Sequence, residues 1–296
     1  MRPTLLDVCA PTTNFQLAVS FELIVRFSMF PRSRACCLTL LATCSPSSLA
    51  FGSLRTSRSS LRLVARKMST IDIATNLADV QSQVDQAARG PVRLVAVSKT
   101  KPIELLQQAY DAGCRVFGEN YAQELVEKVP QLPSDVQWHF IGGLQSNKCN
   151  MLIGAMDTVD RLVIETVDKI KLANKLNNAV PEGQTLKIFV QVNTSGEDSK
   201  SGVEPGEPCV ELCREIAESC PRLHLLGLMT IGAVGDASCF TTLVDCRTQV
   251  AEALGRDDLE LSMGMSGDFV EAIAAGATNV RVGSTIFGAR DYSKNV

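Results

Sequence analysis

The chain has 296 residues, of which 45% are hydrophobic and 21% charged, as is typical of a globular protein with a substantial core. The formal net charge is −3, but residues 1–67 hold nine Lys and Arg against two acids, so residues 68–296 hold 20 basic and 30 acidic side chains. An acidic body without a basic run argues against nucleic acid as a partner. No apolar run reaches the roughly 18–20 residues of a membrane helix, which argues against a membrane-spanning protein.

Residues 1–67 have the features of a targeting presequence. Basic Arg32 and Arg34 precede the apolar segment 35–44, and small residues follow it, as in a signal peptide. Residues 51–67 are rich in Arg and Ser and contain no acid, which is typical of transit peptides. The combination resembles the bipartite plastid presequences of algae with complex plastids.

Two alternatives to the plastid presequence stay open. The segment can instead be mitochondrial, or translation can start at Met68 and give a cytoplasmic protein. We expect residues 1–67 to be cleaved or disordered and exclude them from the fold. Residues 68–296 contain no linker or low-complexity stretch and are interpreted as one domain.

Short apolar runs alternate with amphipathic segments through the rest of the chain. A helix is predicted first, over 71–88, with apolar residues at helical spacing. Eight strands are predicted, the fourth from the weakest pattern, over 94–98, 115–120, 138–142, 156–160, 187–193, 223–231, 259–266 and 279–288. The helices between them are expected over 103–112, 121–129, 162–177, 208–219, 238–254 and 268–276.

This alternation predicts a parallel α/β sheet. Eight strand–helix units, with no G-x-G-x-x-G motif after the first strand, favour a single closed (β/α)8 barrel (a TIM barrel) over an open doubly wound sheet. Active sites of such barrels lie at the carboxyl ends of the strands, and phosphate is often held after strands seven and eight.

Lys99 directly follows the first predicted strand. A partly desolvated lysine at a barrel mouth loses some preference for its charged form, and the neutral amine can condense with an aldehyde to form an imine. Position alone favours the simpler alternative, a solvated lysine at a strand end.

Two glycine- and hydroxyl-containing turns follow the seventh and eighth strands. Ser266 and Gly267 open a predicted helix, where a hydroxyl cap and exposed N–H groups can receive an anion. Gly283 and Ser284 offer a second set of donors. Either turn alone is more simply an ordinary helix cap, but the two together favour a phosphate site.

Arg281, on the eighth strand, is expected to point inward with Gly283, near a phosphate or a ring nitrogen. His139 lies within the third strand, where a core role and a site role are equally plausible. The two His lie far from any Cys, and the seven Cys after residue 67 form no C-x-x-C pair. We therefore expect no metal site and reduced structural thiols.

Seven motifs, in order along residues 70–296, resemble those of the pyridoxal 5′-phosphate (PLP) homeostasis proteins, the YggS/PROSC-like family. They are AVSKTKP (96–102), FGENYAQE (117–124), WHFIGGLQSNK (138–148), QVNTSGEDSKSG (191–202), GLMTIG (227–232), LSMGMSGDFVEAI (261–273) and RVGSTIFGAR (281–290). Gly143 departs from the pattern, because relatives often carry Pro or a larger residue there.

The resemblance implies a monomeric barrel similar to the N-terminal domain of alanine racemase, a fold-type III PLP protein. It implies that Lys99 carries PLP as a Schiff base, and it assigns the remaining positions by motif. Ser266, Gly283 and Ser284 would bind phosphate, Arg281 would face the pyridine nitrogen, Asn120 would lie near the ring, and Met229 would line the pocket.

The resemblance also implies vitamin B6 homeostasis and amino- and keto-acid balance without established catalysis, with PLP-dependent apo-enzymes as candidate recipients. An arginine at the ring nitrogen weakens PLP as an electron sink, which fits a carrier. The expected absence of a second domain argues against the first alternative, an amino-acid racemase. A Schiff-base aldolase of the same fold is the second alternative.

Overall fold

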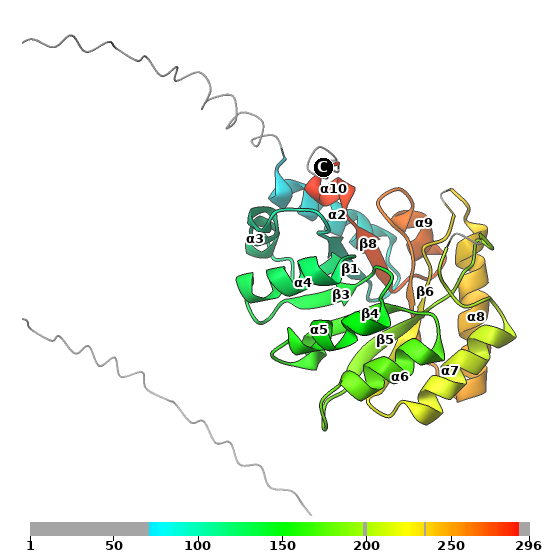
Figure 1. Cartoon of the computed structure of the whole chain (residues 1–296). Coiled ribbons are helices and arrows are strands. Elements are labelled where there is room, and N and C mark those ends of the chain that lie inside the picture. Colours follow the sequence, from blue (N-terminus) through cyan, green and yellow to red (C-terminus); the bar gives the residue numbers. More distant parts are fainter. Residues whose placement is uncertain (1–70, 198–199, 234, 290–296) are drawn as a thin grey trace, which may run out of the picture. The chain divides into compact units, whose positions relative to one another are not determined.

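The computed structural model describes residues 71–197, 200–233 and 235–289 (Figure 1). The expected presequence lies outside these residues and stays a prediction. Within the described ranges, no helix combines the length and apolar character that crossing a membrane requires.

Eight parallel strands close into a barrel in which each strand pairs with the next one along the chain and β1 pairs with β8. The strands are β1 (Arg93–Val97), β2 (Val116–Glu119), β3 (Gln137–Phe140), β4 (Leu162–Val167), β5 (Leu186–Gln191), β6 (Leu223–Met229), β7 (Glu260–Ser262) and β8 (Asn279–Val282). The predicted (β/α)8 architecture is confirmed.

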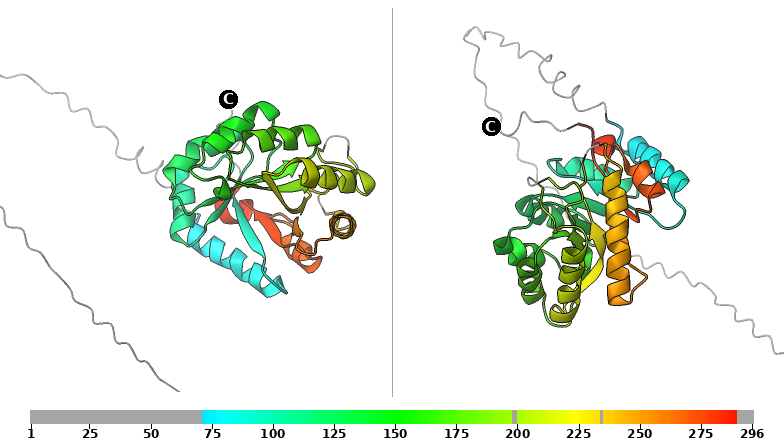
Figure 2. Two further views of the ribbon diagram at one scale, coloured as in Figure 1. Left: turned by 90° about the horizontal axis from the view of Figure 1, so that it is seen from below. Right: turned by 90° about the vertical axis from the view of Figure 1, so that its right-hand side faces the viewer.

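Helices surround the strands, as the left view of Figure 2 shows. The α-helices are α2 (Ile73–Ala87), α3 (Ile103–Asp111), α4 (Ala122–Lys128), α5 (Cys149–Gly154), α6 (Ile170–Ala179), α7 (Glu207–Ser219), α8 (Ser238–Leu254), α9 (Phe269–Ala274) and α10 (Ser284–Phe287). Short 3₁₀ turns are η1 (Val129–Gln131), η2 (Ser146–Lys148) and η3 (Val159–Arg161). The main core fills the space between strands and helices, because both faces of a parallel strand are covered.

Helix α2 completes the helical ring ahead of β1. Its N-cap is Asp72, whose carboxylate accepts a hydrogen bond of 3.1 Å from the Thr75 amide. Its buried stripe, spaced for one helical face, consists of Ile73, Leu77, Val80 and Val84. The helix packs against α3, α9 and the four-residue α10, so that α2 and α10 lie side by side in Figure 1.

The predicted position of the fourth strand is wrong. β4 spans Leu162–Val167, where a helix was expected, and the predicted strand 156–160 forms a turn that leads into η3. The following helix begins only at Ile170. All six residues of β4 are buried, which places Glu165 in the barrel interior. The seventh and eighth strands are also shorter than predicted, and the last turn of the predicted eighth strand forms α10.

Candidate functional site

A cavity of about 470 Å³ opens at the carboxyl ends of β1, β3, β7 and β8. This volume lies within the range of small-ligand sites. Its lining comes mainly from the residues that follow these strands: Val97, Lys99, Lys101, Ile141, Gly235, Met265, Ser266, Gly267, Asp268, Arg281, Gly283, Ser284 and Gly288. The fold therefore brings six of the eight predicted site residues to one cavity: Lys99, Ser266, Gly267, Arg281, Gly283 and Ser284.

Lys99 is half-buried and leaves β1 one residue after the buried Ser98. The next residue, Thr100, has φ +60°, a left-handed conformation that is uncommon for a threonine. Lys101, which follows Thr100, also lines the cavity. Its Nζ donates to the carbonyls of Gly288 and Ala289 at 2.9 and 2.8 Å. The segment after β1 thus contributes two lysines to the site and anchors the residues that follow α10.

The two turns expected to bind phosphate are linked to each other. The Gly283 amide donates to the Ser266 hydroxyl at 3.1 Å. Ser266 was predicted to cap the following helix, and this prediction is wrong. Helix α9 begins at Phe269, with Asp268 at the N-cap position. Asp268 instead accepts from the Met265 amide at 2.6 Å and tightens the turn.

Backbone space in these turns suits an anion. A Cβ added at Gly267 would meet no atom within 4 Å, whereas one at Gly283 would lie 3.1 Å from the Val97 carbonyl oxygen. Gly283 therefore lets β8 pass close to the end of β1, and the α10 N-terminus begins beside the cavity at Ser284. A short helix after β8 is the usual phosphate position in this fold.

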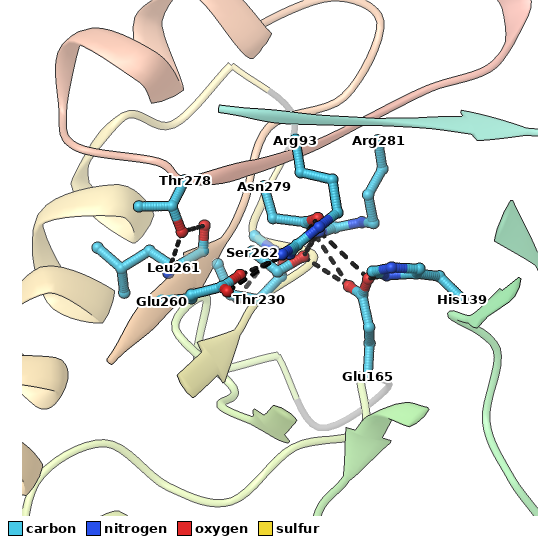
Figure 3. A network of polar contacts seen from close by, with 11 residues as sticks. Arg93, His139, Glu165, Thr230, Glu260, Leu261, Ser262, Thr278, Asn279 and Arg281 are labelled. Carbon is cyan, nitrogen blue, oxygen red and sulfur yellow. Dashed lines mark hydrogen bonds and ion pairs between the residues drawn. The ribbon is translucent and has the colours of Figure 1, made fainter. Parts of the chain in front are cut away.

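Arg281 points into the barrel, as predicted, and ends a buried polar network (Figure 3). Its guanidinium donates to the Ser262 hydroxyl at 2.6 Å and to the Thr230 carbonyl at 2.7 Å, and it lies 3.9 Å from the carboxylate of Glu165. Burial lowers the pKa of Arg281, and the Glu165 charge opposes that shift. With two fixed hydrogen bonds, the guanidinium is held in one orientation at the cavity floor.

Glu165 joins four strands of the barrel. Its carboxylate accepts hydrogen bonds from His139 Nδ1 on β3, from the Ser262 hydroxyl on β7 at 2.5 Å, and from the Asn279 amide on β8 at 3.2 Å. Burial alone would raise the pKa of Glu165, but the hydrogen bond and charge of His139, with Arg281 and Ser262, lower it below its usual value. The network therefore favours a charged carboxylate near Arg281.

His139 belongs to this network and not to the cavity lining. Its Nδ1 donates to Glu165, while Nε2 is buried without a hydrogen-bond partner among the described residues. No acid partner for His139 was predicted, because Glu165 falls where a helix was expected. Ser262 and Asn279 were also missed, since each lies within a strand and neither was given a role, although Ser262 falls within the motif 261–273.

The two remaining predicted site residues lie outside the cavity lining. Met229, at the end of β6, is fully buried and packs with Val163 and Phe189 inside the barrel. Asn120 follows β2, and its Oδ1 is buried without a partner in the described part of the chain. Contact of either residue with a cofactor stays a prediction.

Possible metal ligands do not cluster in the described ranges: no group of three or more His, Cys, Asp or Glu has the arrangement of a metal site. Seven cysteines are described there as buried thiols. Burial raises the pKa of Cys114 to about 11, which keeps that thiol protonated.

The sequence matches the alanine racemase N-terminal domain family over residues 71–291. The mouse (Mus musculus) pyridoxal phosphate homeostasis protein is 50% identical over 218 residues, covering 68% of this chain and 78% of that protein. The Schizosaccharomyces pombe protein of the same name is 46% identical over 235 residues, covering 77% and 96%. The chain belongs to the pyridoxal phosphate homeostasis protein family.

Solved structures agree with this assignment. PipY of Synechococcus elongatus, described with PLP bound, is 33% identical with a TM-score of 0.62 over 73% of this chain and all of that protein. Alanine racemase of Clostridium difficile is 13% identical with a TM-score of 0.58 over 75% of this chain and 61% of that one, which shows the shared barrel. The expected likeness to the N-terminal domain of alanine racemase is confirmed.

Proposed function

We propose that this member of the family holds PLP as a Schiff base on Lys99 and serves PLP homeostasis without turnover of its own. The observation that carries the proposal is one cavity lined both by Lys99 and by the turns after β7 and β8. PLP as the bound cofactor is further supported by relatives named for its homeostasis and by PipY, described with PLP bound.

The residues fit the chemical groups of PLP. The Ser266 and Ser284 hydroxyls and the glycine backbone suit the phosphate, and Arg281 suits the pyridine nitrogen. When bound, PLP supplies an aldehyde that reacts with amines. Lys99 would hold the group by condensation of its amine with that aldehyde, which would release one water and need no oxidant or reductant.

The absence of turnover is supported by the chemistry of the cavity lining. Arg281 is a cation that can only donate hydrogen bonds, so beside the ring nitrogen it would favour the unprotonated ring, whereas a carboxylate there would accept a hydrogen bond from a protonated one. Racemisation also needs an acid–base residue opposite the lysine, and among the described lining residues there is no Tyr, His or Cys. Lys101 and Asp268 line the cavity but are engaged in holding its loops.

Absorbance, borohydride reduction and peptide mapping of PLP-loaded protein test the proposal. Wild-type protein is expected to show an imine absorbance band and PLP reduced onto Lys99, and Lys99→Ala is expected to lose both. Lys169→Ala is the matched control, because Lys169 also follows a strand but is exposed. Label on another lysine would refute the assignment and favour the aldolase alternative.

Steady racemisation of alanine or serine by pure wild-type protein would contradict the carrier role and favour the racemase alternative. Measured PLP transfer from the loaded protein to a PLP-dependent apo-enzyme, faster than from free PLP released in solution, would support delivery. Light scattering at the same concentrations checks the proposed monomer.

The proposed location is the plastid, from the sequence of residues 1–67. A fluorescent protein fused after residue 67 should enter the plastid of an alga with complex plastids. Entry into mitochondria would support a mitochondrial presequence, and a cytoplasmic signal would support a start at Met68.

A further inference from the structure

A buried lysine lies on the helix behind Lys99. Lys128, the last residue of α4, is 6% exposed, and its Nζ contacts three oxygens. These are the Ser98 carbonyl at 2.9 Å and one carboxylate oxygen each of Glu119 and Glu124 at 2.7 Å. An ammonium has three N–H groups, so this lysine satisfies all of them without reaching the cavity.

The two carboxylates extend the contact to both sides of Lys99. The oxygen of Glu119 that binds Lys128 also accepts from the Ser98 hydroxyl at 2.6 Å. The oxygen of Glu124 that binds Lys128 also accepts from the Thr100 amide at 2.6 Å. The residues before and after Lys99 are therefore both bound to one buried ammonium, directly or through a carboxylate.

This arrangement explains the conformation of Thr100. In a residue that has a Cβ atom, a left-handed φ raises the free energy of the backbone. Such a φ persists only where surrounding contacts impose it. The hydrogen bond from the Thr100 amide to Glu124 supports that φ, together with the bond of 3.0 Å from the Lys101 amide to the Ser98 carbonyl that closes the turn. The turn then sends Lys99 to the cavity and Lys101 to the carbonyls that follow α10.

We propose that Lys128, Glu119 and Glu124 act as positioning residues that fix the backbone on both sides of Lys99 and so set the rate and extent of its reaction with PLP. The inference rests on the proposed function, since it assumes that Lys99 is the reacting amine. None of the three residues lines the cavity, so each acts through Ser98 or Thr100.

Glu124 offers the sharpest test, because it is partly exposed and its removal leaves the Lys128–Glu119 pair in place. In Glu124→Ala, we expect imine formation on Lys99 to slow by about tenfold, the order of one hydrogen bond to a charged group. Glu124→Gln keeps an acceptor for the Thr100 amide and should restore most of the rate. Glu127→Ala is the control, since it is an exposed glutamate on the same helix.

A second readout needs no cofactor. Hydrogen exchange of the Thr100 amide in PLP-free protein should accelerate in Glu124→Ala and return toward wild type in Glu124→Gln, with Glu127→Ala unchanged. Lys128→Met, if folded by circular dichroism, should slow imine formation more than Glu124→Ala does. The fold-change in the rate of imine formation in Lys128→Met should exceed the fold-change in its affinity for inorganic phosphate, which reports on the turns after β7 and β8.

The outcomes separate this inference from the proposed function. Borohydride label on Lys99 in wild type, with equal rates in Glu124→Ala and Glu127→Ala, would overturn the positioning role and leave the PLP site intact. Label absent from Lys99 in wild type would overturn both. An equal loss of rate in Glu124→Ala and Glu124→Gln would also contradict the positioning role. It would mean that a hydrogen-bond acceptor for the Thr100 amide does not speed imine formation.

Discussion

Two glutamates are buried completely in this barrel, and their surroundings differ. Glu165, in the interior, accepts hydrogen bonds from three side chains, uses both carboxylate oxygens and lies near Arg281. Glu119, at the end of β2, accepts two hydrogen bonds on one oxygen, from Ser98 and Lys128. Its other oxygen has no partner within the described ranges.

Two features distinguish the surroundings: Glu165 accepts from more donors, whereas at Glu119 the negative charge of Glu124 adds to the effect of burial. The pKa of Glu165 is lowered, although burial opposes this. Burial raises the pKa of Glu119 to about 7, and the nearby Lys128 only partly offsets it. The interior network therefore favours the charged form of Glu165, while the pKa of Glu119 lies near neutral pH.

Removal of the Glu165 side chain should have the largest effect on stability. Glu165→Ala leaves the cation of Arg281 and the ring of His139 buried without their acceptor, so we expect a loss of about 3–5 kcal/mol in the free energy of unfolding. Urea denaturation at pH 7 measures it. Glu127→Ala, on the surface, should change stability by no more than about 0.5 kcal/mol. A loss below about 1 kcal/mol for Glu165→Ala would show that the interior network is weak.

The pH dependence of stability should differ in sign for the two acids. Because the folded pKa of Glu119 is above its unfolded value, its contribution is complete below about pH 4.5 and is lost as pH rises through about 7. The loss is on the order of 3 kcal/mol, and Glu119→Gln should abolish it in urea titrations from pH 5 to 8. The contribution of Glu165 is instead lost as pH falls below its usual range. Identical pH profiles for wild type and Glu119→Gln would refute the raised pKa.

Arg281→Lys tests the contribution of the cation in the interior network. A lysine cannot reach the Ser262 hydroxyl and the Thr230 carbonyl with a rigid fork, so we expect about 1.5–3 kcal/mol less stability. PLP affinity, from equilibrium absorbance, should fall as well. Arg222→Lys, whose guanidinium contacts the Val180 carbonyl away from the cavity, is the control and should keep PLP affinity.

The smallest expected effect concerns the backbone beside Lys99. Thr100→Gly removes the cost of a left-handed φ and adds chain entropy to the unfolded state, so the net gain should not exceed about 1 kcal/mol. Thr248→Gly, in the exposed face of α8, should lose about 0.5 kcal/mol. Thermal denaturation of both variants tests this, and a clear loss in Thr100→Gly would show that the threonine side chain contributes more than its backbone costs.

Most of the fold was predictable because seven strands are short apolar runs, and five of these precede a segment with helical periodicity; α5 and α10 were not predicted. The fourth unit was not, since LVIETVDKIKLANKL reads as one amphipathic helix from Leu162 onward. The β-branched content of Leu162–Val167 favoured a strand, but a glutamate in its middle weakened that pattern. The glutamate is tolerated there because donors from β3, β7 and β8 reach it.

The cavity residues were predictable from strand ends and motifs, whereas their supports were not. Lys99, Ser266 and Gly283 follow strands directly, so topology alone assembles them. Lys128 reads as a solvated residue at the end of a helix, the usual place for a cation. Its burial depends on how α4 packs over Ser98, which a single sequence does not specify.

The contact between α2 and α10 bears on when the molecule becomes functional during synthesis. The Asn76 side chain, from the first described helix, donates to the Ile286 carbonyl in the last one at 3.1 Å, and β1 pairs with β8. A nascent chain must therefore release about 210 further residues from the ribosome before α2 finds its partner. Until then β1 lacks one of its two neighbouring strands, so Lys99 and the turns after β7 and β8 come together only at the final closure of the barrel.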